Sequence, residues 1–161
     1  MLPSISSAPI ACHPHPWVHL KVRKLLKCWP PYKWVMSISR IPILIKFNNR
    51  LQVFGEFNRV LAPRTVDTIT RSMPLEGIID ISGGFLYFPT NLILGAEKPV
   101  RRLQRGSIAY WPLCGGICIS IEDTDAKQNM SLIGRVVSDL EVLKVIRPGS
   151  SARLSAQTID P

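Results

Sequence analysis

The chain has 161 residues, of which 46% are hydrophobic and 19% are charged. This composition is typical of a globular domain with a sizeable core and excludes an intrinsically disordered protein. No apolar run reaches the ~18 residues of a membrane-spanning helix, and four cysteines are too few for a disulfide scaffold. We therefore expect a cytoplasmic protein in a reducing compartment, with no membrane partner.

The net charge of +9 is unevenly distributed along the chain. Residues 1–35 carry five basic and no acidic side chains, whereas residues 36–161 carry 15 basic and 11 acidic ones. Most of the excess therefore lies in the first fifth of the sequence. The remaining part is only mildly basic, so we expect no nucleic-acid partner.

Residues 1–35 also contain six prolines, all three histidines and three of the four tryptophans. We interpret them as a disordered or non-native leader, with Met36 as the true start and one folded domain at residues 36–161. The alternative is a basic amphipathic segment, Lys21 to Lys33, that lies on a membrane or a nucleic acid.

The domain begins with a predicted β-hairpin over residues 41–60, in which apolar side chains alternate on both sides of Asn48 and Asn49. Both asparagines tolerate the positive φ of a two-residue primed turn. Gly55 lies in the middle of the second strand, where a glycine suggests a β-bulge.

A helix is predicted next, over residues 62–73. Pro63 suits its first turn, Asp67 lies near the positive end of its dipole, and Pro74 ends it. Its apolar residues fall at helical spacing and form one stripe, which comprises Val66, Ile69 and Met73.

The rest of the chain alternates between short apolar runs and turn residues. These runs predict strands at residues 77–81, 85–88, 92–94, 108–111, 117–121, 131–137 and 152–154. Residues 100–105 are predicted to be a loop or an edge strand, and residues 122–129 a polar loop. Asp139 is expected to cap a second short helix. Many short strands with only two helices predict a mostly β fold, a closed barrel with helical plugs.

Three segments resemble cyclophilins, in the order in which that family has them. Residues 57–69 contain the Pro-Arg-Thr sequence that opens the first cyclophilin helix, and residues 131–146 are similar to its later strand and second helix. Residues 108–112 (Ile-Ala-Tyr-Trp-Pro) look more specifically like small uncharacterised prokaryotic cyclophilin-like proteins. The resemblance covers residues 41–155 and implies a closed eight-stranded β-barrel with two short helices.

The motifs of the cyclophilin isomerase site do not carry over. Where the family has Phe-His-Arg, residues 74–78 contain neither histidine nor arginine, and its Gly-Ser-Gln-Phe-Phe strand corresponds to residues 115–119 (Gly-Gly-Ile-Cys-Ile). No histidine follows His19, so the domain cannot supply a histidine base. We therefore predict no catalytic residue and no cofactor, and peptidyl-prolyl isomerase activity is uncertain.

We predict a ligand site at the barrel mouth, lined by Tyr87, Tyr110 and Trp111, with Arg64 as an anchor for a carboxylate or phosphate. The alternative is that the aromatic side chains fill the barrel and Arg64 is solvated. The predicted function is a non-catalytic module that binds a small molecule or a short peptide. The alternatives are a weak peptidyl-prolyl isomerase and a structural subunit that assembles through an exposed β edge; the sequence leaves the oligomeric state open.

Other reactive groups favour a structural interpretation. Cys118 is predicted to be buried and unreactive, and so is Cys114, although an exposed, reactive Cys114 is the alternative. We predict no metal site, because the residues at 12–19 with metal-ligand character have no second ligand pair and residues 122–125 lack the glycine and distal glutamate of a calcium loop. The basic cluster of Arg101, Arg102 and Arg105 is either a site for a phosphate-bearing partner or plain surface.

Overall fold

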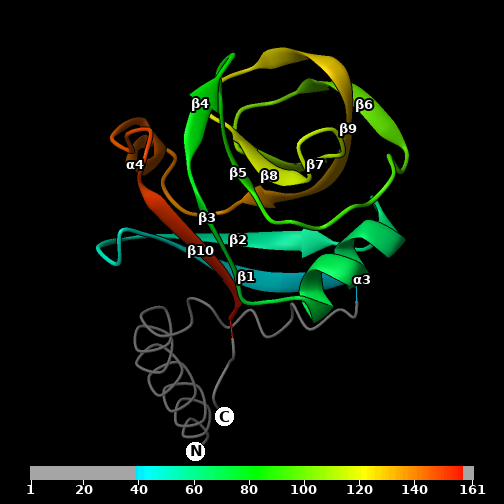
Figure 1. The fold of residues 1–161 in the computed structure, drawn as a ribbon, viewed down its shortest axis with the longest axis horizontal. Helices are drawn as coiled ribbons and strands as arrows, with labels where there is room; N and C mark the ends of the chain where they lie inside the picture. The colour runs from blue at the N-terminus through cyan, green and yellow to red at the C-terminus, as the bar shows by residue number, and fades with distance from the viewer. Residues whose placement is uncertain (1–38, 158–161) are drawn as a thin grey trace, which may run out of the picture. The chain divides into compact units, whose positions relative to one another are not determined.

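The computed structural model describes residues 39–157, so the segment interpreted as a leader lies outside the described residues. The described part is mostly β, with two short helices (Figure 1). Its strands are β1 (Arg40–Phe47), β2 (Leu51–Asn58), β3 (Leu75–Ile78), β4 (Asp80–Ser82), β5 (Phe85–Pro89), β6 (Pro99–Leu103), β7 (Ser107–Trp111), β8 (Gly116–Ser120), β9 (Thr124–Val136) and β10 (Ser151–Ala156). Its helices are α3 (Pro63–Arg71) and α4 (Glu141–Lys144). Within this part, no helix is both long enough and apolar enough to span a bilayer.

The predicted β1–β2 hairpin is confirmed. Asn48 and Asn49 have φ values of 49° and 59°, and the backbone N–H of Arg50 donates to the carbonyl of Phe47 at 3.0 Å. Both central residues therefore have the left-handed conformation that a primed turn requires. The predicted bulge at Gly55 is wrong, because the β1–β2 register continues through this residue without a shift.

All ten strands belong to one antiparallel sheet, in which the long strand β9 is the central element. The sheet order is β3-β10-β1-β2-β9-β7-β8-β5-β4, and β6 pairs with the first part of β9. The predicted loop at residues 122–129 is therefore wrong from Thr124 onward. These residues are polar and yet extended because this part of β9 pairs with β6. Strand β6 covers most of residues 100–105, for which either a loop or an edge strand was predicted, and the edge strand is the one observed.

The two ends of the sheet are formed by neighbouring segments of the chain. Strand β3 pairs with β10 and strand β4 pairs with β5, and only Ile79 separates β3 from β4. No ladder between these end strands occurs in residues 39–157, so the closed eight-stranded barrel is not confirmed. The coarser prediction, a mostly β fold with two short helices, is confirmed.

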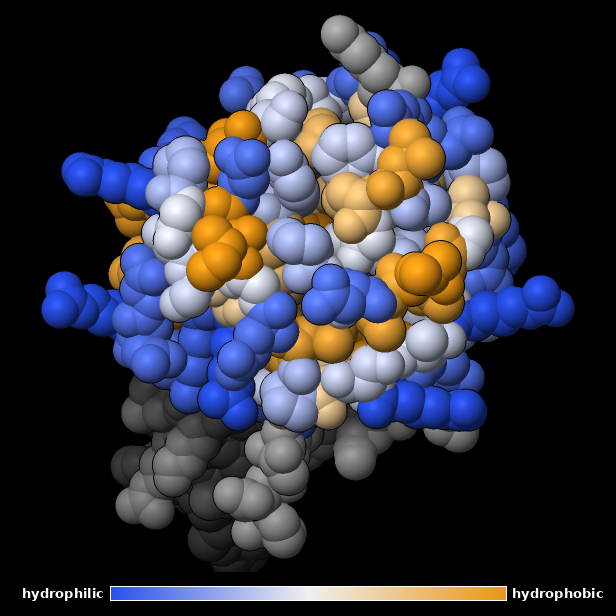
Figure 2. Space-filling view, viewed as in Figure 1, coloured by the Kyte–Doolittle hydropathy of each residue, from blue (hydrophilic) through white to orange (hydrophobic). Residues whose placement is uncertain are grey.

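Both faces of the sheet formed by β5, β8, β7 and β9 are packed. Alternate residues of these strands point to opposite faces, so Tyr110 and Ile117 enter the main core, whereas Ala109 and Cys118 enter a second cluster. This second cluster consists of Phe85, Leu103, Ala109, Cys118, Ala126 and Met130, with Tyr87, Val100, Trp111 and Leu132 packed against it. Figure 2 shows polar and apolar side chains interspersed over one face of the domain, with separate apolar patches.

The two predicted helices are present. Val66 and Ile69 of α3 are fully buried, as the apolar stripe predicted, and the Asp139 carboxylate accepts a hydrogen bond from the Glu141 N–H at 2.9 Å at the start of α4. The predicted interaction of Asp67 with the positive end of the α3 dipole is wrong. Asp67 lies in the middle of the helix and pairs with Arg59 at 3.0 Å.

The ladder between β2 and β9 requires glycine at two positions. A Cβ placed on Gly134 would lie 2.1 Å from the carbonyl oxygen of Glu56 and 2.9 Å from the Cα of Phe57. A Cβ on Gly55 would lie 2.9 Å from the carbonyl oxygen of Arg135. Gly55 therefore marks a close backbone approach rather than a bulge, and a side chain at either position would force β2 and β9 apart.

We predict that Gly134→Ala destabilises the domain by more than about 3 kcal/mol, because backbone atoms cannot yield to the added methyl group. Gly95→Ala is the matched control, because a Cβ at Gly95 meets nothing within 4 Å, and we expect it to change stability by less than about 0.5 kcal/mol. Urea unfolding followed by far-UV circular dichroism measures both. Equal stability of the two variants would contradict the prediction.

Candidate ligand-binding site

Tyr110 and Trp111 are neighbours on β7 and therefore point to opposite faces of the sheet. Tyr110 is fully buried in the main core. Its hydroxyl donates to the Leu92 carbonyl at 2.6 Å and accepts from the Leu94 N–H at 3.1 Å. Burial raises the pKa of the Tyr110 hydroxyl, which therefore stays protonated and able to donate.

Tyr110 thus anchors the connection between β5 and β6. The strand predicted at residues 92–94 is wrong, because these residues belong to no ladder and have the Tyr110 hydroxyl as a hydrogen-bonding partner. Leu92 and Leu94 pack against the main core, while Ile93 between them is 96% exposed. The apolar side chains do alternate as in a strand, but the backbone of Leu92 and Leu94 forms hydrogen bonds with the Tyr110 hydroxyl instead of with a neighbouring strand.

Trp111 meets Tyr87 and Phe85 on the other face of the sheet. The Tyr87 and Trp111 ring centroids are 5.4 Å apart with an interplanar angle of 74°, and Trp111 and Phe85 are 5.8 Å apart at 88°. These are the edge-to-face geometries that aromatic pairs favour. Phe85 is buried, whereas Tyr87 and Trp111 are half-buried, so each of these two residues keeps part of its surface in contact with solvent. We call Tyr87 and Trp111 the aromatic pair.

The polar atoms of the aromatic pair have partners in the protein. The Tyr87 hydroxyl donates to the Asp80 carboxylate at 3.0 Å, and the Trp111 Nε1–H donates to the Gln128 side-chain oxygen at 2.6 Å. The hydrogen bond to Asp80 is the largest cause of the raised pKa of Tyr87, followed by partial burial. These bonds fix the two rings at their steep mutual angle, so an angled apolar surface with a carboxylate and an amide at its margins is held in place.

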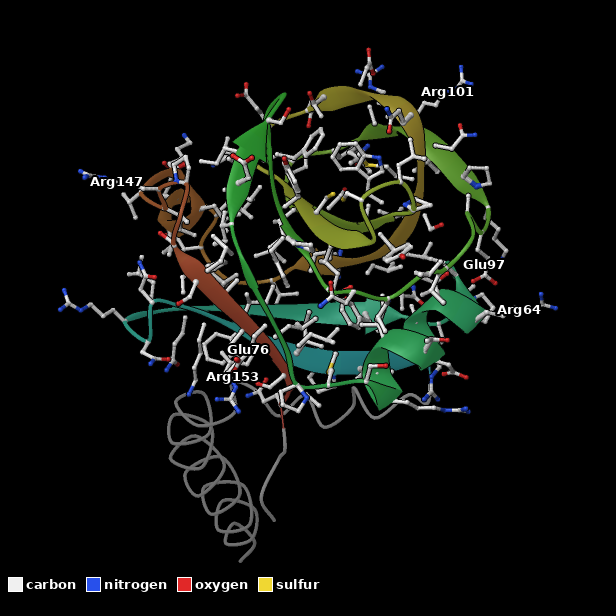
Figure 3. All side chains as sticks on the ribbon, viewed as in Figure 1. Arg64, Glu76, Glu97, Arg101, Arg147 and Arg153 are labelled. Carbon is white, nitrogen blue, oxygen red and sulfur yellow. The ribbon has the colours of Figure 1, made fainter. Side chains whose placement is uncertain are left out.

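Arg64 does not join the aromatic residues. It lies in the first turn of α3 and is exposed, and Figure 3 shows its side chain extending away from the domain, past Glu97. Of the four residues predicted to form the ligand site, the structure therefore brings together Tyr87 and Trp111, buries Tyr110 and leaves Arg64 on the surface.

Glu97 is a structural residue that no local sequence pattern predicts. Ala62, the N-cap of α3, provides no side-chain hydrogen bond. Instead, one carboxylate oxygen of Glu97 accepts from the N–H (2.9 Å) and the hydroxyl (3.0 Å) of Thr65, and the other accepts from the Arg64 N–H at 3.4 Å. The cap comes from 32 residues away, beyond the range of any local helix-start pattern.

The pKa of Glu97 is set by opposed effects, of which desolvation is the largest single one. Desolvation by itself favours the neutral carboxyl, but the hydrogen bonds from Thr65 and Arg64, with the Arg64 charge, outweigh it and lower the pKa of Glu97. An ionised carboxylate at a helix N-terminus also interacts favourably with the helix dipole. Glu97 therefore ties the loop before β6 to the start of α3.

Of the two cysteines in residues 39–157, Cys118 lies in the core and Cys114 is partly exposed. Cys118 is fully buried, and desolvation strongly raises the pKa of its thiol. Cys114 is half-buried, and desolvation also raises its pKa, so the geometry gives no support to a reactive thiolate. Among residues 39–157, no three His, Cys, Asp or Glu side chains are close enough to hold a metal ion. The histidines and Cys12 lie outside the described residues.

Comparison with known proteins agrees with this fold. The model of a family described as cyclophilin-like matches residues 40–155, so the chain belongs to the cyclophilin-like family. The solution structure of the hypothetical protein AF2241 from Archaeoglobus fulgidus is similar, with a TM-score of 0.62 and 24% sequence identity. The similarity covers 74% of this chain and 96% of that one. The predicted resemblance to small uncharacterised cyclophilin-like proteins is therefore confirmed.

A second similar structure belongs to a larger protein, McbB, solved in complex with tryptophan. Its TM-score is 0.61 at 13% identity, over 74% of this chain and 46% of McbB. A comparison with curated proteins gives no match. At these identities the similarity establishes the fold alone.

We predict that Glu97→Gln lowers the free energy of unfolding at pH 7 by about 1 kcal/mol, as expected for loss of a helix cap. The pKa of Glu97 is lower in the folded than in the unfolded protein, so its contribution is complete above its usual value of 4.5 and is lost as the pH falls through the lowered value. Urea unfolding at a series of pH values should therefore show that the difference in unfolding free energy between wild type and Glu97→Gln shrinks as the pH falls below 4.5.

Glu76→Gln is the control for Glu97, because Glu76 is exposed and pairs across strands with Arg153, at 3.4 Å. We expect it to change stability by less than about 0.5 kcal/mol. A difference between wild type and Glu97→Gln that grows as the pH falls would refute the capping role.

Proposed function

We propose that the chain is a non-catalytic binding module that takes a small molecule or a short peptide on the aromatic pair. The observation that carries the proposal is the incomplete burial of Tyr87 and Trp111, although Phe85 beneath them is buried and their polar atoms are already bonded. A ligand that covers these rings removes apolar surface from water without breaking a hydrogen bond of the protein.

The chemistry at the margins of the aromatic pair favours an amphipathic ligand. The Asp80 carboxylate and the Gln128 amide hold the ring ends at 3.0 Å and 2.6 Å and keep further lone pairs and amide hydrogens. A flat or cyclic apolar group flanked by amide or ammonium groups, as in an aromatic amino acid or a proline-containing peptide, matches this surface. The tryptophan bound to McbB supplies a convenient probe of this kind.

The alternative function, prolyl isomerisation, has less support. The groups that bond to the aromatic pair are a carboxylate and an amide, and neither is the cationic donor that would polarise a prolyl nitrogen. The domain also has no histidine. Arg64, which lies in the cyclophilin-like Pro-Arg-Thr sequence, is the first candidate for a substitute cationic donor. Its side chain points away from the domain (Figure 3).

We predict that an Ala-Pro peptide and free tryptophan each shift the Trp111 indole N–H signal in ¹⁵N-resolved NMR spectra of the full chain, in a saturable manner. We also predict that exchange spectroscopy on the same peptide shows no acceleration of cis/trans interconversion, which takes tens of seconds or longer without catalysis. Sub-second exchange would refute the non-catalytic function and favour the isomerase.

Two alanine variants test the location of the site. Tyr87→Ala should weaken binding by about tenfold, because the ring provides much of the contact area. Phe54→Ala is the matched control, since Phe54 is an aromatic residue on β2 that is 37% exposed and does not belong to the aromatic pair, and this variant should leave affinity unchanged. Equal weakening by both variants would contradict this location.

A further inference from the structure

A cavity of about 470 Å³ lies over the ladder that joins β2 and β9. Neither member of the aromatic pair lines it. Its charged lining is formed by Arg40, Glu56, Arg105 and Arg135, and we call it the arginine groove. Its uncharged lining includes Asn58, Leu61, Gln104, Ser107, Leu132 and Gly134. Its volume is in the range of pockets that hold small molecules.

Sheet register brings the charged residues of the arginine groove together. Arg135 on β9 lies opposite Glu56 on β2 and opposite Ser107 on β7, so these three residues form one row across the sheet. Arg40 on β1 lies opposite Asn58, two residues further along β2 than Glu56. Four strands therefore supply one surface, and the close β2–β9 approach at Gly134 forms part of its lining.

Glu56 holds two of the three arginines. One oxygen of its carboxylate contacts Arg135 Nε at 3.0 Å and Arg40 Nη1 at 3.6 Å. The Glu56 side chain is only 18% exposed, whereas those of Arg135 and Arg40 are 65% and 49% exposed. A guanidinium has five N–H donors, so both arginines keep donors that can face the groove.

Arg105 completes the cationic lining from the turn between β6 and β7. Its Nη2 pairs with Glu141 at 2.5 Å, and its backbone N–H donates to the Asp123 carboxylate at 2.8 Å. Arg105 and Glu141 are 41% and 59% exposed, and an exposed pair of this kind contributes little free energy, so the guanidinium can also bind a second anion. Arg101 and Arg102, the other members of the basic cluster, do not line the groove.

The groove has a formal surplus of two positive charges, from three guanidinium groups and one carboxylate. It also offers neutral polar groups on Asn58, Gln104 and Ser107 and apolar surface on Leu61 and Leu132. A phosphate monoester carries a charge of about −1.5 to −2 at pH 7 and binds guanidinium groups through parallel hydrogen bonds. The mixed lining suits the organic part of such a molecule.

We propose that the arginine groove is a binding site for a small organic phosphate, held by Arg40, Arg105 and Arg135. Glu56 is a positioning residue in this site, because it orients Arg40 and Arg135 without being a donor itself. This site is separate from the aromatic pair and does not depend on the proposed function.

The test uses the full chain, ¹⁵N-labelled, and titrates inorganic phosphate and glycerol phosphate at constant ionic strength, with acetate as a separate arm. We expect saturable shifts of the backbone amides of Gly106, Ser107 and Arg135 in the millimolar range with both phosphates. Arg135→Gln and Arg40→Gln should each weaken binding by about tenfold, since each removes a charge-assisted donor.

Arg153→Gln is the matched control. Arg153 is 54% exposed and pairs across strands with Glu76, as Figure 3 shows, so the variant loses the same charge outside the groove. We expect it to change affinity by less than twofold. The proposal is overturned if no saturable shift occurs, if Arg153→Gln weakens binding as much as Arg135→Gln, or if acetate binds as tightly as phosphate.

Discussion

Strands β2 and β9 approach each other so closely that neither Gly55 nor Gly134 leaves room for a side chain. This contact joins the hairpin of β1 and β2 to the strands β5, β7 and β8, because β9 follows β2 in the order of the sheet and β7, β8 and β5 come after it. It also aligns Glu56 with Arg135. Both candidate surfaces depend on it: the arginine groove lies over the contact, and β9 positions β7, which carries Trp111.

The period of two residues along a strand explains how much of the candidate site could be predicted. The sequence identified Tyr110 and Trp111 as neighbours on a strand, and pleating then separates them, with one in the core and the other half-exposed. Their division between two faces follows from that strand assignment. The contact of Trp111 with Tyr87 and Phe85 does not, because it depends on the order β7-β8-β5, which no local pattern specifies.

Local sequence patterns correctly predicted the turns and helix starts that depend on neighbouring residues. The Asn48–Asn49 turn, the Pro63 start of α3 and the Asp139 contact at α4 all depend on residues a few positions apart. The errors have long-range causes. Residues 92–94 are satisfied by Tyr110, the first part of β9 is paired with β6, and α3 is capped by Glu97. The arginine groove belongs to this second group, since its charged residues come from β1, β2, β9 and a turn.

Intermolecular NOEs would locate a ligand bound on the aromatic pair. We would record them between a proline-containing peptide and the full chain at saturation. We expect NOEs from the proline ring protons to the ring protons of Tyr87 and Trp111, and none to Tyr110, which is buried on the opposite face. NOEs confined to residues remote from the aromatic pair would contradict this expectation.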